Sequence, residues 1–389
     1  MSDKITEFLT RNVSEVIDRV HLEKKLRSKK KLRIKLGIDP TSKNIHIGRA
    51  IVLWKLRLLQ DMGHKIVLIV GDFTGLVGDT SDKDSERPML TQKQVRENMK
   101  GYIRQFGKIV DLKKAEVHFN SKWLSKLGYL EIAGQADQFS LHEFEARENV
   151  ARRMKKNQRV SLREVLYPLM QGYDSVAVKA DLEIGGTDQR FNLLAGRTLQ
   201  KYYGQEPQDI MTFDLLEGTD GRKMSSSWGN VINIMDEPNN MFGKTMSIKD
   251  ELIIKYFVAC TAVSMDHVKE MEKGLNTGKI NPRDAKAGLA REIVALYYGA
   301  KAADKAEQHF MQVHVNRQNP ENIRAFKGAG HTIVNILVKS GIAASNSQAR
   351  RLIDQGGVKV DGIVCKKYDQ VAGKGVVLQA GKRNFIKVS

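Results

Sequence analysis

A histidine, a threonine and an arginine occur together where an apolar run gives way to a helix. The stretch reads "IDPTSKNIHIGRA" over residues 38–50 and contains Thr41, His46, Gly48 and Arg49. A helix N-terminus presents free N–H groups and a positive dipole end, so it stabilises an anion such as phosphate. The alternative is that Thr41 or its neighbour only caps the helix and that His46 is a surface residue.

A second stretch, far along the chain, carries a lysine among small polar residues. It reads "GRKMSSS" over residues 221–227 and contains Lys223. A lysine in a loop of this kind can close over a triphosphate and neutralise the charge that develops on departing pyrophosphate. A solvated loop without chemistry is the alternative for this stretch taken alone.

The elements around the first stretch predict how it is positioned. Residues 32–38 alternate with a period of two and indicate a strand, and residues 47–62 have helical apolar spacing, with Gly63 placed to end the helix. Residues 65–72 are a solidly apolar run typical of a buried parallel strand. Strand, helix and strand form a βαβ unit, whose ligands bind at the carboxyl ends of the strands.

The rest of the chain divides by pattern. The pattern predicts, in order, a helical region at 91–175, strands at 175–184 and 211–218, helices without a strand at 237–325, a linker at 315–330 and a basic C-terminal module. The last 59 residues hold ten Lys and Arg against three Asp and no Glu.

Charge and composition narrow the class of protein. The 389 residues carry a net charge of +19, which favours a polyanionic partner, although solubility alone is the other interpretation. Cys260 and Cys365 are the two cysteines, and they lack the spacing of a disulfide framework or a zinc site, so no metal ligands are predicted. The start has no signal-peptide pattern and no run suits a membrane helix, so we expect a cytoplasmic protein without a membrane partner.

The two motif stretches, in this order on one α/β domain, resemble the HIGH and KMSKS signatures of class I aminoacyl-tRNA synthetases. Four further stretches resemble the bacterial type of tyrosyl-tRNA synthetase. They are "GDFTGLVGDTSDKDSER", "YPLMQGYDS", "EIGGTDQRFN" and "SNSQARRLIDQGGVKVDG". The resemblance extends from about residue 30 to the end of the chain.

This resemblance implies site residues. The implied catalytic residues, which stabilise the γ-phosphate side or bind pyrophosphate, are Thr41, His46, Lys83, Arg87 and Lys223. The implied tyrosine-binding residues are Lys35, Gly37, Asp39, Thr74, Asp79, Tyr167, Gln171, Asp174 and Gln189. The implied ATP-binding residues are Gly48, Arg49, Gly186, Asp188, Met224, Ser225 and Ser226.

In the family, a carboxylate, a tyrosine and a glutamine hold the tyrosine amino group, and the matching residues are Asp79, Tyr167 and Gln171. An aspartate meets the phenol hydroxyl, and Asp174 matches it. The substrate carboxylate itself attacks the α-phosphorus of ATP, so the enzyme needs orientation and cations rather than a nucleophile of its own. We find no Ser-His-Asp arrangement in the sequence.

Three positions depart from the family pattern. Arg49 replaces the second histidine of HIGH, and Ser226 replaces the second lysine of KMSKS, so we hypothesise that Arg49 partly compensates for the missing cation. Lys35 stands where many relatives place a tyrosine against the substrate phenol, and a lysine near Asp174 would form an ion pair.

The C-terminal stretch from Ser345 to Gly362 predicts a helix, a Gly-Gly stop, a strand and an Asp-Gly turn, and it resembles the S4 RNA-binding module. Arg350, Arg351 and Lys359 would form a compact cationic surface for structured RNA. A solvated helix face is the alternative.

Together these features predict an α/β fold: a Rossmann-like parallel-sheet catalytic domain (1–236), an α-helical domain that approaches the anticodon arm (237–328) and a small α+β S4-like domain (329–389). The resemblance implies a homodimer that joins L-tyrosine to tRNA(Tyr), with ATP as a substrate and Mg²⁺ bound mainly by phosphates and water. The rival interpretations are a synthetase-like RNA-binding protein that has lost catalysis, a tryptophanyl synthetase and a nucleotidyltransferase of the HxGH type.

Overall fold

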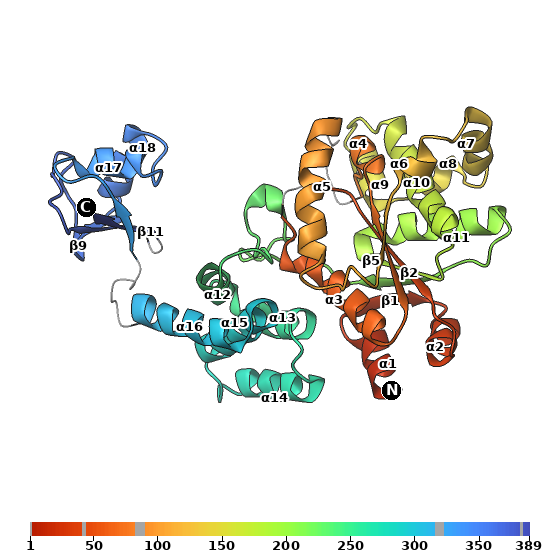
Figure 1. Ribbon diagram of the computed structural model, residues 1–389, viewed down its shortest axis with the longest axis horizontal. Coiled ribbons are helices and arrows are strands. Elements are labelled where there is room, and N and C mark those ends of the chain that lie inside the picture. The colour runs from red at the N-terminus through yellow and green to blue at the C-terminus, as the bar shows by residue number, and fades with distance from the viewer. Residues whose placement is uncertain (1, 41–43, 82–89, 316–322, 382–383) are drawn as a thin grey trace. The chain divides into compact units, whose positions relative to one another are not determined.

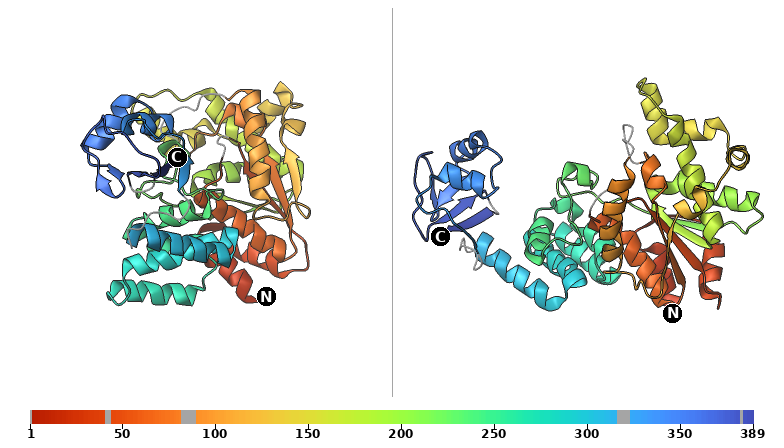
Figure 2. Two further views of the ribbon diagram at one scale, coloured as in Figure 1. Left: turned by 60° about the vertical axis from the view of Figure 1, so that its left-hand side comes forward. Right: turned by 45° about the horizontal axis from the view of Figure 1, so that its top comes forward.

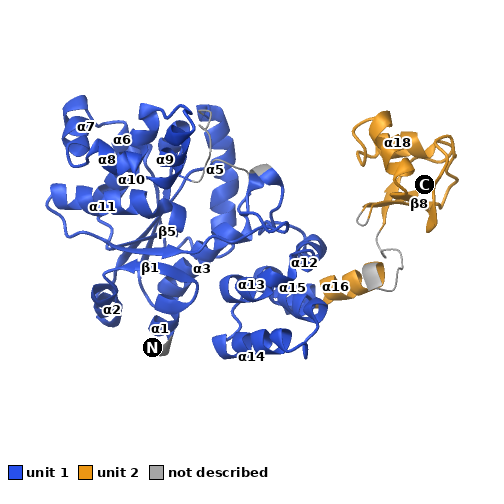
Figure 3. Ribbon diagram, turned by 180° about the vertical axis from the view of Figure 1, so that it is seen from behind, with its two compact units in different colours: residues 1–303 blue, residues 304–389 orange. Residues whose placement is uncertain are grey.

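The chain folds into two compact units, residues 1–303 and residues 304–389 (Figure 3). The computed structural model describes residues 2–40, 44–81, 90–315, 323–381 and 384–389. Within the described part, no helix combines the length and apolar character needed to cross a membrane.

The first unit is built on a six-stranded sheet with the order β1–β6–β5–β2–β3–β4 (Figure 1). Its strands are β1 (Val13–Ile17), β2 (Arg33–Ile38), β3 (Lys65–Val70), β4 (Glu116–Phe119), β5 (Leu182–Gly186) and β6 (Asp209–Phe213). All neighbouring pairs are parallel except β1 and β6. The predicted parallel-sheet α/β fold is therefore confirmed.

Helices cover both faces of this sheet (Figures 1 and 2). The principal ones are α3 (Ile47–Asp61), α5 (Gln92–Phe106), α10 (Leu162–Val178) and α11 (Arg190–Tyr202). From β2 the chain runs outward through α3 and α5, then returns through α10 and α11 to the other side of β2. Because parallel crossovers are right-handed, the two helix pairs lie on opposite faces. The order reverses between β2 and β5, which is where such folds bind ligands.

The first unit contains further helices and 3₁₀ turns. They are α1 (Ser2–Thr10), α2 (Arg19–Arg27), α4 (Thr74–Val77), α6 (Ser121–Leu124), α7 (Tyr129–Ala136), α8 (Leu141–Glu145), α9 (Glu148–Lys155), the 3₁₀ turns η1 (Thr187–Gln189) and η2 (Ser226–Trp228), and the cluster α12 (Pro238–Met246), η3 (Asp250–Leu252), α13 (Ile253–Cys260), α14 (Met265–Asn276) and α15 (Pro282–Tyr298). This cluster confirms the helices predicted after residue 237, while the boundaries of a three-domain division stay a prediction.

The helix α3 begins and ends as its sequence indicates. Its N-cap is His46, whose Nδ1 accepts a hydrogen bond from the backbone N–H of Arg49. Its apolar stripe packs against the sheet, and Gly63 follows its end with a positive φ of 93°. Because a residue without Cβ tolerates that conformation, the chain can turn there into β3.

The strand predicted at 175–184 is wrong in its first half. Helix α10 continues to Val178, and β5 starts only at Leu182. The β-branched residues near 176–178 suggested a strand, but α10 packs along α11 so closely that a Cβ on Gly172 would lie 3.0 Å from backbone atoms of Ala195. Tertiary packing outweighs local β-propensity here.

Two edge strands were not predicted from the sequence. β4 interrupts the region expected to be helical from 91 to 175, and β1 precedes the first predicted strand. The strand expected at 211–218 corresponds to β6, which starts earlier and ends at Phe213. Short edge strands bury few side chains, so their apolar periodicity is weak.

The second unit has a separate sheet and a separate core. Its elements are α16 (Ala300–Phe310), which begins in the first unit, η4 (Met311–Val315), β7 (Arg324–Phe326), α17 (Ile333–Lys339), α18 (Asn346–Asp354), β8 (Val358–Val360), β9 (Ile363–Val364), β10 (Val377–Ala380) and β11 (Asn384–Val388). The strand order is β7–β11–β10–β8–β9, with a buried cluster from α17, α18 and the strands. The predicted small α+β module is confirmed, although β7 occupies part of the predicted linker.

Candidate functional site

Helix α10 presents three polar side chains on one face, where it packs against β2. Tyr167, Gln171 and Asp174 are spaced four and three residues apart, so they lie on the same side of the helix. All three are nearly inaccessible to solvent. All three residues were predicted from the stretch "YPLMQGYDS". The structure brings their side chains together at the point where the sheet order reverses.

Asp174 is a buried carboxylate held by two neutral donors. The indole Nε1 of Trp123 donates to its Oδ1 at 2.7 Å, and Nδ2 of Asn120 donates to its Oδ2 at 3.2 Å. Burial raises the pKa of Asp174 to about 7, against the lowering effect of the Lys35 charge and of these two hydrogen bonds. A carboxylate of this kind can accept a hydrogen bond from a hydroxyl group that reaches it.

A second carboxylate, Asp39, follows β2. Tyr167 donates its hydroxyl to Oδ2 of Asp39 at 3.0 Å, and Thr74 donates to Oδ1 at 2.7 Å. Nδ2 of Asn120 also lies 2.9 Å from the Thr74 hydroxyl. Asn120 therefore links Asp39, through Thr74, to Asp174 in one chain of hydrogen bonds.

Asp79 and Gln189 meet although they come from different loops. Nε2 of Gln189 donates to Oδ2 of Asp79 at 2.7 Å, and Ser81 donates to the other oxygen. On β2, a Cβ on Gly37 would find no atom within 4 Å. Open space thus adjoins β2 at Gly37, a residue that the sequence assigned to amino-acid binding.

The partners of Lys35 differ from the expectation. Its ammonium group forms an ion pair with Glu183 at 2.9 Å, not with Asp174, and it donates to the backbone oxygen of Gln171 and to the hydroxyl of Ser175. The predicted Lys35–Asp174 ion pair is therefore wrong. Lys35 and Glu183 are opposite each other in the neighbouring strands β2 and β5, so the ammonium group of Lys35 pairs with Glu183 rather than with Asp174.

The HIGH-like stretch at residues 38–50 and the KMSKS-like stretch at residues 221–227 lie side by side. The backbone N–H of Ile47 donates to the carbonyl of Ile232, and that of Ile234 donates to Ile45, so the segment after "GRKMSSS" pairs with the segment before α3. A Cβ on Gly48 would lie 3.4 Å from the sulfur of Met224. This contact joins the HIGH-like and KMSKS-like stretches directly.

Asp188, in the turn η1 that follows β5, meets Lys223 from the KMSKS-like loop. Their charged atoms lie 3.4 Å apart, and both side chains are partly exposed. A Cβ on Gly186 would clash with Asp188 at 2.6 Å, so Gly186 lets that carboxylate lie against the strand end. The carboxylate of Asp188 is the predicted ribose ligand, and Lys223 is the predicted pyrophosphate ligand.

Asn230 holds the KMSKS-like loop. Its Oδ1 accepts from the N–H of Ser225 at 2.9 Å, while its Nδ2 donates to Asp220 at 2.7 Å and to the carbonyl of Lys223 at 3.1 Å. Ser226 is exposed and begins η2. Arg49, in the first turn of α3, donates to the hydroxyl of Tyr102 at 3.1 Å.

Three predicted residues lie outside the described part of the chain. They are Thr41, Lys83 and Arg87. Within the described part, no group of three or more His, Cys, Asp and Glu side chains is arranged to hold a metal ion.

Four further polar residues support the site without having been predicted. They are Asn120, Trp123, Glu183 and Asn230. Asn120 directly follows β4, so recognising that strand would have placed it at the same sheet edge. Glu183 is an acidic residue inside a buried strand opposite Lys35, a pattern that indicates an ion pair. No signal in the sequence points to Trp123 or Asn230.

On the second unit, the predicted RNA-binding residues Arg350 and Arg351 are exposed on α18, and Lys359 lies on β8. The guanidinium of Arg350 stands 5.6 Å from the ring centre of Tyr368. The surface combines cations with an aromatic ring, which is suited to RNA.

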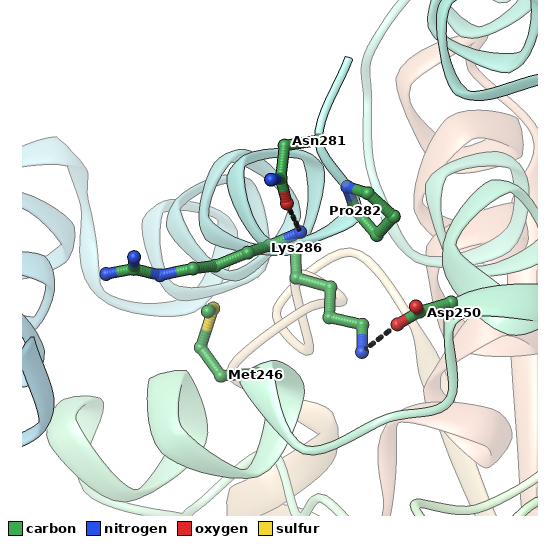
Figure 4. A pocket seen from close by; sticks show the side chains of 6 residues that line it. Met246, Asp250, Asn281, Pro282 and Lys286 are labelled. Carbon is green, nitrogen blue, oxygen red and sulfur yellow. Dashed lines mark hydrogen bonds and ion pairs between the residues drawn. The ribbon is translucent and has the colours of Figure 1, made fainter. Parts of the chain in front are cut away.

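A separate pocket of about 330 Å³ lies in the helical cluster (Figure 4). Lys286 of α15 forms an ion pair with Asp250 at its rim, and Asn281 caps α15 by accepting from the N–H of Arg283. Met246 and Pro282 supply its apolar lining. None of these residues was predicted as a site residue.

Comparisons with known proteins agree with this geometry. The family model of the tRNA synthetases class I (W and Y) matches residues 27–314, and that of the S4 domain matches residues 332–378. The chain is 44% identical to a tyrosine–tRNA ligase of Thermotoga maritima, over 98% of this chain and 96% of that protein. It is also 44% identical to a tyrosine–tRNA ligase of Moorella thermoacetica, over 98% and 94%.

A solved structure has the same fold at low sequence identity. It is the tyrosyl-tRNA synthetase of Archaeoglobus fulgidus in complex with L-tyrosine, with a TM-score of 0.63 and 23% identity over 79% of this chain and 99% of that chain. The matching family model, the near full-length relatives and the adjoining motif loops lead to one conclusion. The chain belongs to the class I tRNA synthetase family that includes the tryptophan and tyrosine enzymes, and it carries an S4 domain.

Proposed function

We propose that this protein is a tyrosine–tRNA ligase. It activates L-tyrosine with ATP, releasing pyrophosphate and forming tyrosyl-adenylate, and then transfers tyrosine to the 3′ end of tRNA(Tyr). The observation that carries the proposal is the buried Asp174, held by Trp123 and Asn120, together with the open space at Gly37 of β2. The names of the relatives support the same activity.

In this proposal, Asp174 accepts a hydrogen bond from the substrate phenol. Phenylalanine would leave that buried acceptor without a partner, which costs more than a lost apolar contact, an effect for which tyrosyl-tRNA synthetases are themselves the standard example. At the other end of the substrate, the ammonium group is held by Asp79, Tyr167 and Gln171. Gln189 reaches the carboxylate group that is activated.

The nucleotide lies across the adjoining motif loops. Asp188 binds the ribose, while Gly48 and Met224 face the adenosine side. Thr41 and His46 stabilise the γ-phosphate side of the transition state, and the cations Lys83, Arg87 and Lys223 bind the departing pyrophosphate. The tyrosine carboxylate attacks the α-phosphorus, the bond to pyrophosphate breaks, and AMP stays attached to tyrosine. This protein contributes orientation and charge, which are enough for such a displacement.

Mg²⁺ would accompany ATP as its phosphate complex. This ion prefers oxygen ligands, keeps several water ligands and usually binds nucleotides through their phosphates. Its charge would therefore act on the same phosphate oxygens that Lys223 approaches. Arg49 adds a further cation to that region, which fits the hypothesis that it offsets the serine at position 226.

The tRNA would contact both units. Arg350, Arg351 and Lys359 on the S4 domain supply phosphate contacts, and the helical cluster with its Lys286 pocket approaches the anticodon arm. The net charge of +19 supports a nucleic-acid partner of this kind.

Exposed apolar side chains support a homodimer. Tyr129 and Leu130 of α7 are 93% and 91% exposed, and Leu162 of α10 is 79% exposed. Large apolar groups that face solvent on neighbouring helices are typical of an interface between copies. Two free, buried cysteines suit a reducing compartment, and we propose a cytoplasmic location.

ATP–pyrophosphate exchange with each amino acid supplied in turn tests the proposal. Exchange that depends on tyrosine, and not on tryptophan or phenylalanine, is the expected result. Absence of exchange together with binding of structured RNA would instead establish an RNA-binding protein without catalysis, the alternative suggested by Arg49 and Ser226.

A further inference from the structure

Lys35 and Glu183 occupy a special place in the sheet. They are opposite each other in the pairing of β2 with β5, and they form the second and last pair of that short ladder. Beyond them the two strands lead to different loops, one to Asp39 and the other to Asp188. Both side chains are buried, with 0% and 1% exposure.

The ammonium group of Lys35 has all its donors engaged. It donates to the backbone oxygen of Gln171 at 2.8 Å and to the hydroxyl of Ser175 at 2.7 Å, and it pairs with Glu183 at 2.9 Å. A lysine has three N–H groups, so none is left for a substrate phenol. Two of these three partners belong to α10, on either side of Asp174.

Glu183 is satisfied in the same way. Its Oε1 accepts from Lys35 and from Nε2 of Gln171, the latter at 3.2 Å. Its Oε2 accepts from Ser175 at 3.0 Å and from Gln208 at 2.5 Å. Because a carboxylate only accepts hydrogen bonds, Glu183 fixes the side-chain amide of Gln171 with its nitrogen Nε2 toward the carboxylate and its oxygen Oε1 away from it.

This orientation leaves the side-chain oxygen Oε1 of Gln171 available. Among the described residues, that oxygen accepts no hydrogen bond, while the amide nitrogen is committed to Glu183. An ammonium group needs acceptors, so the orientation set by Glu183 is the one that the amino end of an amino acid requires. A flipped amide would present a donor instead.

Stability alone does not account for the pair. A buried ion pair is often no more stabilising than apolar residues of the same volume, because desolvation offsets the attraction. Removal of one partner is costly, but replacement of both by neutral groups is tolerated. The two buried charges are therefore better explained by a role in fixing the geometry of their neighbours.

We propose that Lys35 and Glu183 are positioning residues for the amino-acid site, which hold the Gln171 amide and the turn of α10 that carries Asp174. The inference rests on the proposed function, because Gln171 and Asp174 are taken there as ligands of tyrosine. Lys35 thus acts through α10 and not by touching the substrate.

The decisive variant is the neutral double substitution Lys35→Met with Glu183→Gln, assayed by tyrosine-dependent ATP–pyrophosphate exchange. We expect an unfolding midpoint near that of the wild type, a KM for tyrosine at least tenfold higher and a KM for ATP within twofold. A double variant with the wild-type KM for tyrosine would overturn the inference.

A matched control uses another ion pair on the same sheet. Arg33, two residues before Lys35, pairs with Glu116 at 2.8 Å on the side of β2 away from β5, and its Nε also donates to the backbone oxygen of Val178 at the end of α10. The double substitution Arg33→Met with Glu116→Gln removes the same charges, and we expect an unchanged KM for tyrosine. An equal rise in the control would assign the effect to general disturbance of the sheet and overturn the inference.

A milder variant keeps the test decisive if the double variant folds poorly. Ser175→Ala removes only the hydroxyl between Lys35 and Glu183, and we expect a threefold or larger rise in the KM for tyrosine with an unchanged KM for ATP. An unchanged KM for tyrosine would contradict the inference. Wild-type protein without tyrosine-dependent exchange would overturn the proposed function itself, which separates the two failures.

Discussion

The indole nitrogen of Trp123 lies 2.7 Å from Oδ1 of Asp174 and donates a hydrogen bond to it. Because a hydrogen bond to a charged group contributes about 1.5–3 kcal/mol, Trp123→Phe should raise the pKa of Asp174 above its present value of about 7. We expect the KM for tyrosine to rise roughly tenfold at pH 7 and to recover partly at higher pH.

The measurement is the pH profile of the KM for tyrosine between pH 6 and 9. Trp54→Phe is the control, because Trp54 donates to Tyr297 and contacts neither Asp174 nor its donors. Identical pH profiles for the Trp123 variant and the wild type would contradict this account.

The raised pKa of Asp174 also makes a prediction about stability. Its pKa is about 7 in the folded protein against a usual 3.8, so folding disfavours the ionised form. The associated stability is fully present below about pH 4 and is lost as pH rises through 7. Asp174→Asn cannot ionise. Between pH 5 and pH 8, the wild type should therefore lose about 3 kcal/mol of unfolding free energy relative to this variant.

Urea unfolding of both proteins at the two pH values measures this difference. All other titrating groups are common to the two proteins, so their contributions cancel. Equal pH dependence in both would show that Asp174 ionises in the fold as easily as in water.

Lys223 is predicted to act in the transition state. Lys223→Met should lower the rate of tyrosine-dependent exchange by about 10²–10³ while leaving the KM for tyrosine unchanged, because the charge is needed only as pyrophosphate departs. Its contact with Asp188 is partly exposed, so the unfolding midpoint should not change. A variant impaired only in its KM for tyrosine would refute this role.

Asn230 is predicted to matter through the loop that it holds. Asn230→Ala removes the acceptor for the N–H of Ser225 and the donor to the carbonyl of Lys223. We expect a roughly tenfold loss in kcat/KM for ATP, measured by exchange, since each such hydrogen bond contributes about 1 kcal/mol. The exposed Asn276 on α14 provides the control as Asn276→Ala, which should behave as the wild type.

A buried ion pair joins α9 to α10. Arg153 and Glu164 are 1% and 2% exposed, and Thr80 donates to the same glutamate at 2.6 Å. Arg153→Met should lower the free energy of unfolding by about 3–5 kcal/mol, because Glu164 is left buried without its partner. The double variant with Glu164→Gln should recover most of this loss in urea unfolding. An additive loss would contradict the explanation.

The sequence predicted the central βαβ unit and both motif loops because their physical signals are local. The run before Asp72 is solidly apolar, and the region around His46 combines a strand end with a helix start. The roles of Tyr167, Gln171 and Asp174 came from the resemblance, and their common face follows from helical spacing. These roles remain predictions that the experiments above address.

The remaining errors have non-local causes. Helix α10 extends past Ser175 because it packs on α11, which no window of sequence reveals. Lys35 pairs with Glu183 because the strands β2 and β5, about 150 residues apart in the chain, become neighbours. Trp123 lies on the short helix α6 and Asn120 is the N-cap of that helix, directly after an unpredicted edge strand, so their approach to Asp174 depends on the assembled fold.

The hydrogen-bond chain through Asn120 has a consequence for engineering this protein to accept other aromatic amino acids. Nδ2 of Asn120 donates hydrogen bonds to both Thr74 and Asp174. A substitution of Asn120 would therefore disturb both of these predicted tyrosine-binding residues at once. The indole N–H of Trp123, in contrast, donates a hydrogen bond to Asp174 and not to Thr74. A redesign aimed at a bulkier para substituent would therefore begin at Trp123 and keep Asn120 intact.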